Sequence, residues 1–69
     1  MTPDEFLRRL RRLARRRDLE LIEEPGEGSH RKIRLGGRRT VVPMHKRDLP
    51  TGTWRAILKQ LGLSPEDLA

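Results

Sequence analysis

The chain has 69 residues and no cysteine, so it has room for one compact domain (1–69) and forms neither disulfides nor thiolate metal sites. Sixteen Lys and Arg residues against ten Asp and Glu give a formal net charge of +6. The N-terminus does not resemble a signal peptide, and no apolar run approaches the ~20 residues of a membrane span. We therefore expect a soluble, cytoplasmic protein with no membrane contact.

The charges are sorted along the chain. Residues 18–27 hold five acids and no base, whereas residues 28–47 hold seven bases and no acid. Segregation of this kind builds a positive face, for which RNA or DNA is the usual partner. Carboxylates are absent where the bases gather, which argues against a metal site and against two-metal nuclease chemistry. We expect neither a metal nor a small-molecule cofactor.

The first predicted element is an amphipathic helix. Thr2 suits the N-cap, Pro3 the first helical position, and Glu5 a capping box. The following apolar residues recur with the helical period: Phe6, Leu7, Leu10, Leu13 and Ala14. Arginines occupy the opposite side: Arg8, Arg9, Arg11, Arg12, Arg15 and Arg16. That side is either a phosphate-contacting ridge or a solvated helix face, and we favour the solvated face.

Three strands are predicted after Asp18, which marks the end of the helix. Their expected bounds are residues 19–23, near 29–35 and 38–44. Residues 25–28 form a loop between the first two strands. Gly36-Gly37 is a two-residue hairpin signal between the second and third strands.

Alternation along the second strand separates an apolar face from a polar one. Ile33 and Leu35 must enter the core. The solvent face then receives His30, Lys32 and Arg34. A regular hairpin register adds two residues of the third strand to the solvent face, Arg39 and Val41, and two to the core, Thr40 and Val42. A slip of one residue would exchange these two sets.

The last predicted elements are helical. A loop at 46–50 leads to a helix that begins around 51–53. Its apolar residues have helical spacing: Trp54, Ile57, Leu58 and Leu61. Gly62 follows as the C′ residue, and residues 64–67 favour one further turn. The order α-β-β-β-α predicts an α+β fold, with two helices packed on one face of a three-stranded antiparallel sheet and the other face open to solvent.

His30 and His45 are the only histidines, the residue type that changes protonation near neutral pH. RNA carries its own nucleophile, the 2′-hydroxyl, so a ribonuclease needs a proton acceptor, positive charge near the phosphate and an orienting surface. His30 supplies the acceptor, and Lys32 and Arg34 the charge. Ser29 either orients the imidazole or the phosphate, or only begins the strand. His45 is favoured as a loop residue touching phosphate or solvent over a second acid-base residue.

Several runs of the chain resemble the HicA toxin family, also called YcfA-like. They are Gly28-Ser29-His30-Arg31, Gly36-Gly37-Arg38, the run 40–45 and the run 49–64. The resemblance covers about residues 19–68. It implies a double-stranded-RNA-binding-domain-like fold and a metal-independent mRNA-cleaving toxin that a HicB-type antitoxin holds inactive. It also places the family's catalytic histidine on His30.

We therefore predict a toxin endoribonuclease in which His30 activates the 2′-hydroxyl or protonates the leaving oxygen. The RNA-binding candidates are Ser29, Arg31, Lys32, Arg34, Arg39 and His45. Strand alternation favours Lys32 and Arg34 among the phosphate-stabilising residues. Two alternatives stay open. One is a non-catalytic RNA-binding module on the same fold, which does not need a histidine at position 30. The other is an interaction subunit whose basic surface docks an acidic protein.

Overall fold

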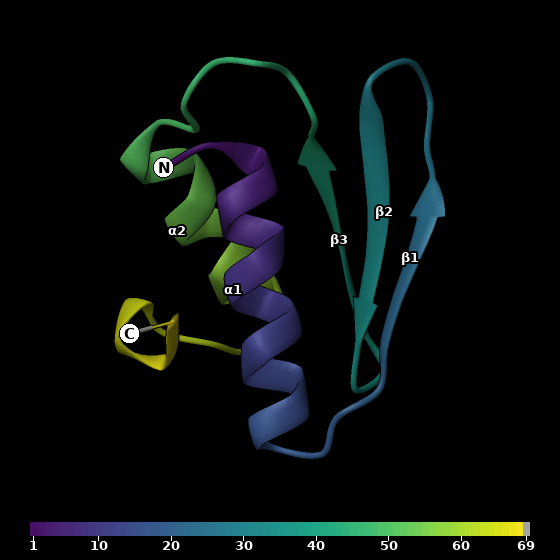
Figure 1. Ribbon diagram of the computed structural model, residues 1–69, viewed down its shortest axis with the longest axis vertical. Coiled ribbons are helices and arrows are strands. Elements are labelled where there is room, and N and C mark those ends of the chain that lie inside the picture. The colour runs from purple at the N-terminus through teal and green to yellow at the C-terminus, as the bar shows by residue number, and fades with distance from the viewer. Residues whose placement is uncertain (69) are drawn as a thin grey trace.

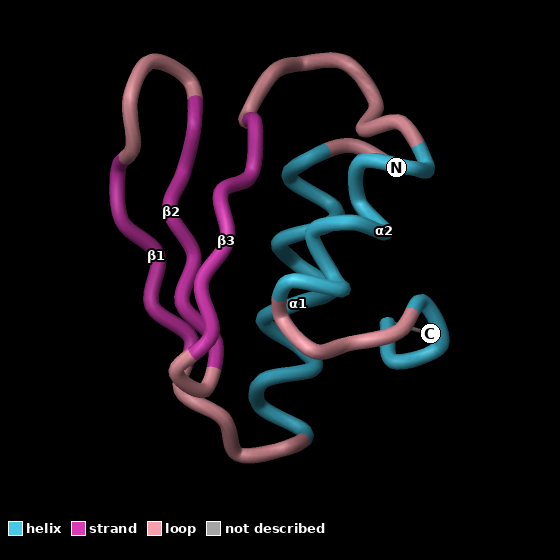
Figure 2. Tube along the Cα trace, turned by 180° about the vertical axis from the view of Figure 1, so that it is seen from behind, coloured by secondary structure: helices cyan, strands magenta, loops and turns pink. Residues whose placement is uncertain are grey.

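A computed structural model describes residues 1–68 of the chain. Its elements are α1 (Pro3–Arg16), β1 (Leu21–Pro25), β2 (His30–Leu35), β3 (Arg38–Pro43), α2 (Thr51–Gln60) and the 3-10 helix η1 (Pro65–Leu68). The strands form one antiparallel sheet in the order β1-β2-β3. The helices lie on one side of this sheet, and its other face is open (Figures 1 and 2). The predicted α+β architecture is confirmed.

α1 begins and ends with well-defined caps. The Thr2 hydroxyl accepts a hydrogen bond from the Glu5 amide at 3.2 Å, as the N-cap prediction requires. At the other end, Asp18 adopts a left-handed φ of 53°, and the Leu19 amide donates to the Ala14 carbonyl at 2.8 Å. This C-terminal motif includes Leu19, which the sequence prediction assigned to the first strand. β1 consequently runs from 21 to 25 rather than from 19 to 23.

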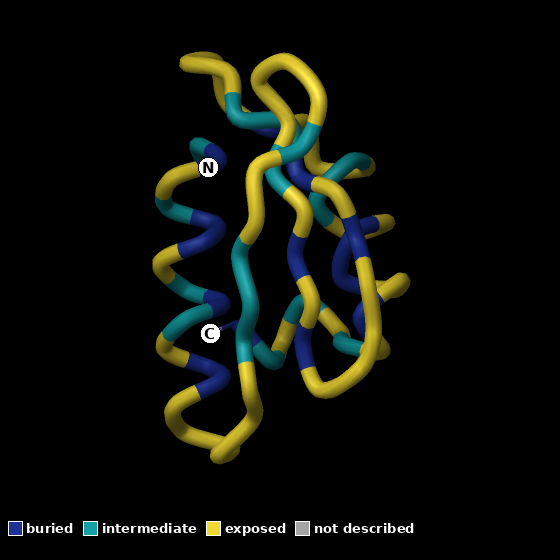
Figure 3. The backbone as a smooth tube through the Cα atoms, turned by 90° about the vertical axis from the view of Figure 1, so that its right-hand side faces the viewer, coloured by how far each residue is buried: buried dark blue, intermediate teal, exposed yellow. Residues whose placement is uncertain are grey.

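The core lies between the sheet and the two helices. The buried apolar residues are Phe6, Leu7, Leu10, Leu13, Ala14, Ile33, Leu35, Val42, Leu49, Ile57, Leu58, Leu61 and Leu68. Figure 3 shows buried and exposed residues alternating along β2 and β3. The inward face of β2 predicted from alternation, Ile33 and Leu35, is confirmed, and so are the inward positions of Thr40 and Val42 on β3.

Side-chain hydrogen bonds connect α2 to the sheet and the end of α1 to η1. The buried Thr40 hydroxyl on β3 donates to the side-chain oxygen of Gln60 at the end of α2. Arg17, just after α1, donates to the Asp67 carboxylate in η1. Gly62 has a φ of 74° directly after the C-cap residue Leu61, as the C′ prediction requires. Within residues 1–68 no helix is long and apolar enough to cross a membrane.

Candidate nucleic-acid interface on the open sheet face

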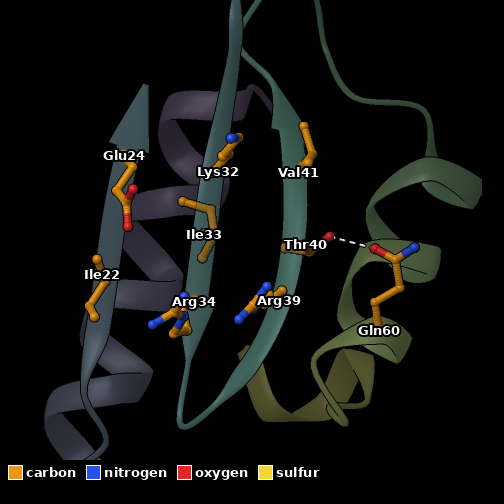
Figure 4. A pocket seen from close by; sticks show the side chains of 9 residues that line it. All are labelled: Ile22, Glu24, Lys32, Ile33, Arg34, Arg39, Thr40, Val41 and Gln60. Atoms are coloured by element: carbon orange, nitrogen blue, oxygen red, sulfur yellow. Dashed lines mark hydrogen bonds between the residues drawn. The ribbon is translucent and has the colours of Figure 1, made fainter. Parts of the chain in front are cut away.

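The strand register arranges the open face of the sheet in rows across all three strands. One row is Glu24, Lys32 and Val41. The next row is Ile22, Arg34 and Arg39. These six residues line a solvent-open hollow of about 780 Å³, which we call the open-face hollow (Figure 4). The prediction that Arg39 and Val41 share a face with Lys32 and Arg34 is confirmed, because the β2–β3 hairpin contains no bulge.

Three cations dominate this face. Lys32, Arg34 and Arg39 are all exposed, and none of their side chains has a hydrogen bond or an ion pair with another residue among 1–68. Arg34 and Arg39 are direct cross-strand partners (Figure 4). Like charges directly opposite each other in a sheet are destabilising, and an anion bound between them would relieve the repulsion. The face is therefore suited electrostatically to a phosphate backbone.

His30 lies two residues before Lys32 on the same face of β2, at the end where the β1–β2 hairpin closes. Its Nδ1 is 3.2 Å from the carbonyl oxygen of Glu27, which also accepts the His30 backbone N–H at 3.0 Å. A carbonyl oxygen can only accept, so the ring donates from Nδ1, and the neutral imidazole keeps a lone pair on Nε2. Because the side chain is exposed, a large substrate can reach it. The hairpin thus orients a proton acceptor at the end of the cationic face.

Ser29 and His45 come to the same end of the sheet as His30. The Ser29 carbonyl accepts a hydrogen bond from the Met44 amide at 2.8 Å, which extends the pairing of β2 with β3 by one step. His45 directly follows Met44, and both Ser29 and His45 are exposed. A smaller hollow of about 440 Å³ at this end includes Ser29, His30 and Met44 in its lining. The fold therefore brings His45 to the same end of the sheet as Ser29 and His30, from which it is separated in the chain.

Arg31 occupies a different environment from the other candidates. It alternates with His30 and Lys32, so it lies on the helix side of β2, where it donates to the Glu23 carboxylate at 3.3 Å. Arg11 of α1 makes two hydrogen bonds to the same carboxylate, at 2.6 and 2.8 Å. The Arg11 hydrogen bonds, helped by the attraction of both arginines, hold the pKa of Glu23 below its ordinary value. The same hydrogen bonds raise the pKa of Arg11.

The sequence interpretation did not place β1 residues in the site. Ile22 and Glu24 enter the open-face hollow because β1 pairs with β2 in a register that alternation alone did not determine. The adjacent residues Glu23 and Glu24 were the signal in the sequence that could have placed a β1 residue in the site. Neighbouring residues of a strand point to opposite faces, so one of the two had to lie on the open face. Among residues 1–68, no group of three or more His, Cys, Asp or Glu side chains gathers as metal ligands would.

An α-β-β-β-α domain with two helices behind a basic, open sheet face belongs to the double-stranded-RNA-binding-domain-like class of folds. The family described as "HicA toxin of bacterial toxin-antitoxin" matches residues 7–63, and the chain belongs to this family. A relative from Pseudomonas fluorescens (strain Pf0-1), named "Probable mRNA interferase HicA", is 44% identical over 41 residues, which are 58% of this chain and 68% of the relative. The family predicted from the sequence motifs is confirmed.

Proposed function

We propose that this HicA-family toxin is an endoribonuclease that cleaves single-stranded RNA, mRNA included, without a metal ion, and that His30 is its catalytic residue. The name of the Pseudomonas relative, an mRNA interferase, supports the substrate class. One observation carries the catalytic role. The Glu27 carbonyl engages Nδ1 of His30 and leaves Nε2 as the proton acceptor of an exposed ring beside Lys32.

In the proposed reaction, Nε2 of His30 takes the proton of a ribose 2′-hydroxyl. The 2′ oxygen attacks the adjacent phosphorus, and the bond from phosphorus to the 5′ oxygen breaks. The 5′ oxygen takes up a proton from water, and the imidazolium returns its proton to solvent. The products carry a 2′,3′-cyclic phosphate and a 5′-hydroxyl. Lys32, the nearest cation on the same face of β2, stabilises the charge that develops on the phosphoryl oxygens.

The remaining candidates hold the RNA strand on either side of the cleaved bond. Arg34 and Arg39 extend the cationic face away from His30, and Ser29 and His45 flank it at the hairpin end. The absence of acids between residues 28 and 47 supports a route that relies on the 2′-hydroxyl rather than on a metal-bound nucleophile. Arg31 is outside this surface, because it pairs with Glu23 on the helix side of the sheet.

The partner of the toxin in this proposal is a HicB-type antitoxin that covers the open sheet face. Such a cover blocks access to His30 and screens the repulsion between Arg34 and Arg39. A domain of this size is only marginally stable, and a partner that binds the folded state alone stabilises it by mass action. We expect the melting temperature of the toxin to rise in the complex. An isolated chain as stable as the complex would argue against this arrangement.

The decisive experiment incubates the purified chain with single-stranded RNA in EDTA, beside the His30→Ala variant. We expect the parent to cut and the variant to lose at least about a hundredfold in rate. The affinity of the variant for RNA should stay close to that of the parent, because the phosphate-binding cations remain. If neither protein cuts and both bind equally, the chain is a non-catalytic RNA-binding module. Strict Mg²⁺ dependence or 5′-phosphate ends would contradict the proposed route.

A further inference from the structure

Glu24 is the one acidic side chain of the open-face hollow. It is exposed, and its cross-strand partner is Lys32. Among residues 1–68 its carboxylate makes no ion pair and no hydrogen bond, whereas the adjacent Glu23 is held by two arginines on the other face. Its charge is balanced in part by Lys32 across the strands, but it repels the phosphates that the cations of this face attract, so binding of the RNA phosphate backbone does not account for its place in the hollow.

The surroundings of Glu24 suit a nucleobase better than a phosphate. Ile22 lies two residues away on the same face of β1, and Figure 4 shows the two side chains next to each other along the strand. Val41, 47% exposed, adds apolar surface at the other end of the same row, beyond Lys32 of β2. A base lying over Ile22 presents its polar edge to the Glu24 carboxylate. Single-stranded RNA is commonly recognised through contacts with the flat faces of its bases and hydrogen bonds to their Watson–Crick edges.

An ionised carboxylate has two oxygens that can only accept hydrogen bonds. The Watson–Crick edge of guanine offers two neighbouring donors, N1–H and the N2 amine. Adenine and cytosine each place a ring-nitrogen acceptor beside their single amine, and uracil places carbonyl oxygens on both sides of its N3–H. The two oxygens of Glu24 therefore match guanine and meet a repulsive acceptor on each of the other bases.

We propose that the open-face hollow is a nucleobase subsite, in which Glu24 accepts two hydrogen bonds from a guanine next to the cleaved bond. The Glu24 row lies about 7 Å from His30 along the strands, so a base in the hollow belongs to a nucleotide close to the reacting phosphate. Lys32, Arg34 and Arg39 hold the flanking phosphates. This proposal rests on the proposed ribonuclease function for where cleavage occurs, but not for the binding of the base itself.

The test uses single-stranded oligonucleotides that differ at one position, with guanosine, inosine, adenosine, cytidine or uridine in an otherwise uniform strand. Inosine lacks only the N2 amine. We expect the full chain to cleave beside guanosine about tenfold faster than beside inosine. Glu24→Gln should bring this ratio to within about twofold of unity, because its amide replaces one acceptor by a donor. Glu66→Gln, which removes the same charge from the exposed side of η1, should leave the ratio unchanged.

Binding measurements separate this proposal from the ribonuclease function. Fluorescence anisotropy with the His30→Ala chain, which leaves the RNA intact, should show the same guanosine preference, lost on adding Glu24→Gln. Cleavage without a base preference, or a preference that survives Glu24→Gln, overturns the subsite and leaves the ribonuclease standing. If guanosine-containing strands are bound preferentially but the parent does not cleave them, the subsite stands and the ribonuclease function is overturned. Similar melting temperatures for the parent and Glu24→Gln, expected because the Glu24 carboxylate makes no hydrogen bond or ion pair within residues 1–68, exclude misfolding as the cause.

Discussion

Arg34 and Arg39 stand directly opposite each other in the β2–β3 ladder, exposed on the open face of the sheet. Neither has an ion-pair partner among residues 1–68. Opposite charges at these positions would stabilise the hairpin, whereas two cations weaken it. An anion bound between the two side chains would relieve their repulsion. We therefore expect stability and RNA binding to change in opposite directions when one of the two charges is removed.

Replacing one of these cations tests that relationship. We expect Arg39→Gln to raise the free energy of unfolding of the free chain by about 0.5 kcal/mol, because the like-charge contact is lost. Its RNA affinity should fall, and the slope of log affinity against log salt should decrease by about 1. Urea denaturation and anisotropy titrations over a range of salt measure the two effects. Arg12→Gln, on the exposed side of α1, is the matched control and should leave the salt slope unchanged.

The ion pairs of Glu23 with Arg11 and Arg31 make the stability of the fold depend on pH. The hydrogen bonds from Arg11 and the charge of Arg31 lower the pKa of Glu23 in the folded state. A carboxylate with a lowered pKa contributes stability above its unfolded-state pKa, near 4.5, and loses that contribution as the pH falls through the folded-state value. Glu23→Gln should therefore cost about 1 kcal/mol at neutral pH and much less once the parent carboxyl is protonated.

Urea denaturation of the parent and Glu23→Gln at neutral and acid pH checks this expectation. Glu24→Gln is a close control, since it makes the same change one residue away on the open face, where the carboxylate makes no hydrogen bond or ion pair with the described residues. It should not alter stability in this pH-dependent way. An equal loss for Glu23→Gln at both pH values would show that the ion pairs contribute nothing through their charge.

The contact between Thr40 and Gln60 should fasten α2 to the edge of the sheet. Thr40→Val keeps the β-branched shape in the buried position but removes the hydroxyl that donates to Gln60. Because Gln60 is exposed and can turn to water, we expect a loss of about 1 kcal/mol in the free energy of unfolding. A double-mutant cycle with Gln60→Ala measures the coupling. Additive losses from the two changes would mean that the hydrogen bond does not contribute to stability.

Gly26 should control the position of His30. A Cβ at Gly26 would lie 3.0 Å from the His30 carbonyl oxygen, so Gly26→Ala must shift the hairpin by a few tenths of an ångström. On the proposed mechanism we expect cleavage to slow by about tenfold while RNA affinity changes little, because the displaced group is the proton acceptor. Gly52→Ala, where an added Cβ meets nothing within 4 Å, is the control and should keep the parent rate. Unchanged cleavage by Gly26→Ala would contradict a positional role for the hairpin.

Local patterns in the sequence were sufficient to predict much of the fold and part of the candidate site. The helical periods, the caps and the Gly36-Gly37 turn predicted every helix and strand, and alternation from Ile33 assigned Lys32 and Arg34 to the open face. The hairpin then fixed Arg39 opposite Arg34. These features are local, because alternation and a two-residue turn relate residues that are close in the chain.

The pairing of β1 with the sheet and the contacts of the charged side chains could not be predicted from local patterns and depend on the three-dimensional packing. Because Asp18 adopts a left-handed conformation after α1, β1 begins only at Leu21. The pairing of β1 with β2 then places Glu23 beside the arginines on the helix side and Glu24 in the open-face hollow. The contact of His30 with the Glu27 carbonyl likewise depends on the shape of the hairpin. The physical reason is that a one-residue change of register exchanges the faces of a strand, and the register of β1 is set by packing against distant segments rather than by its own residues.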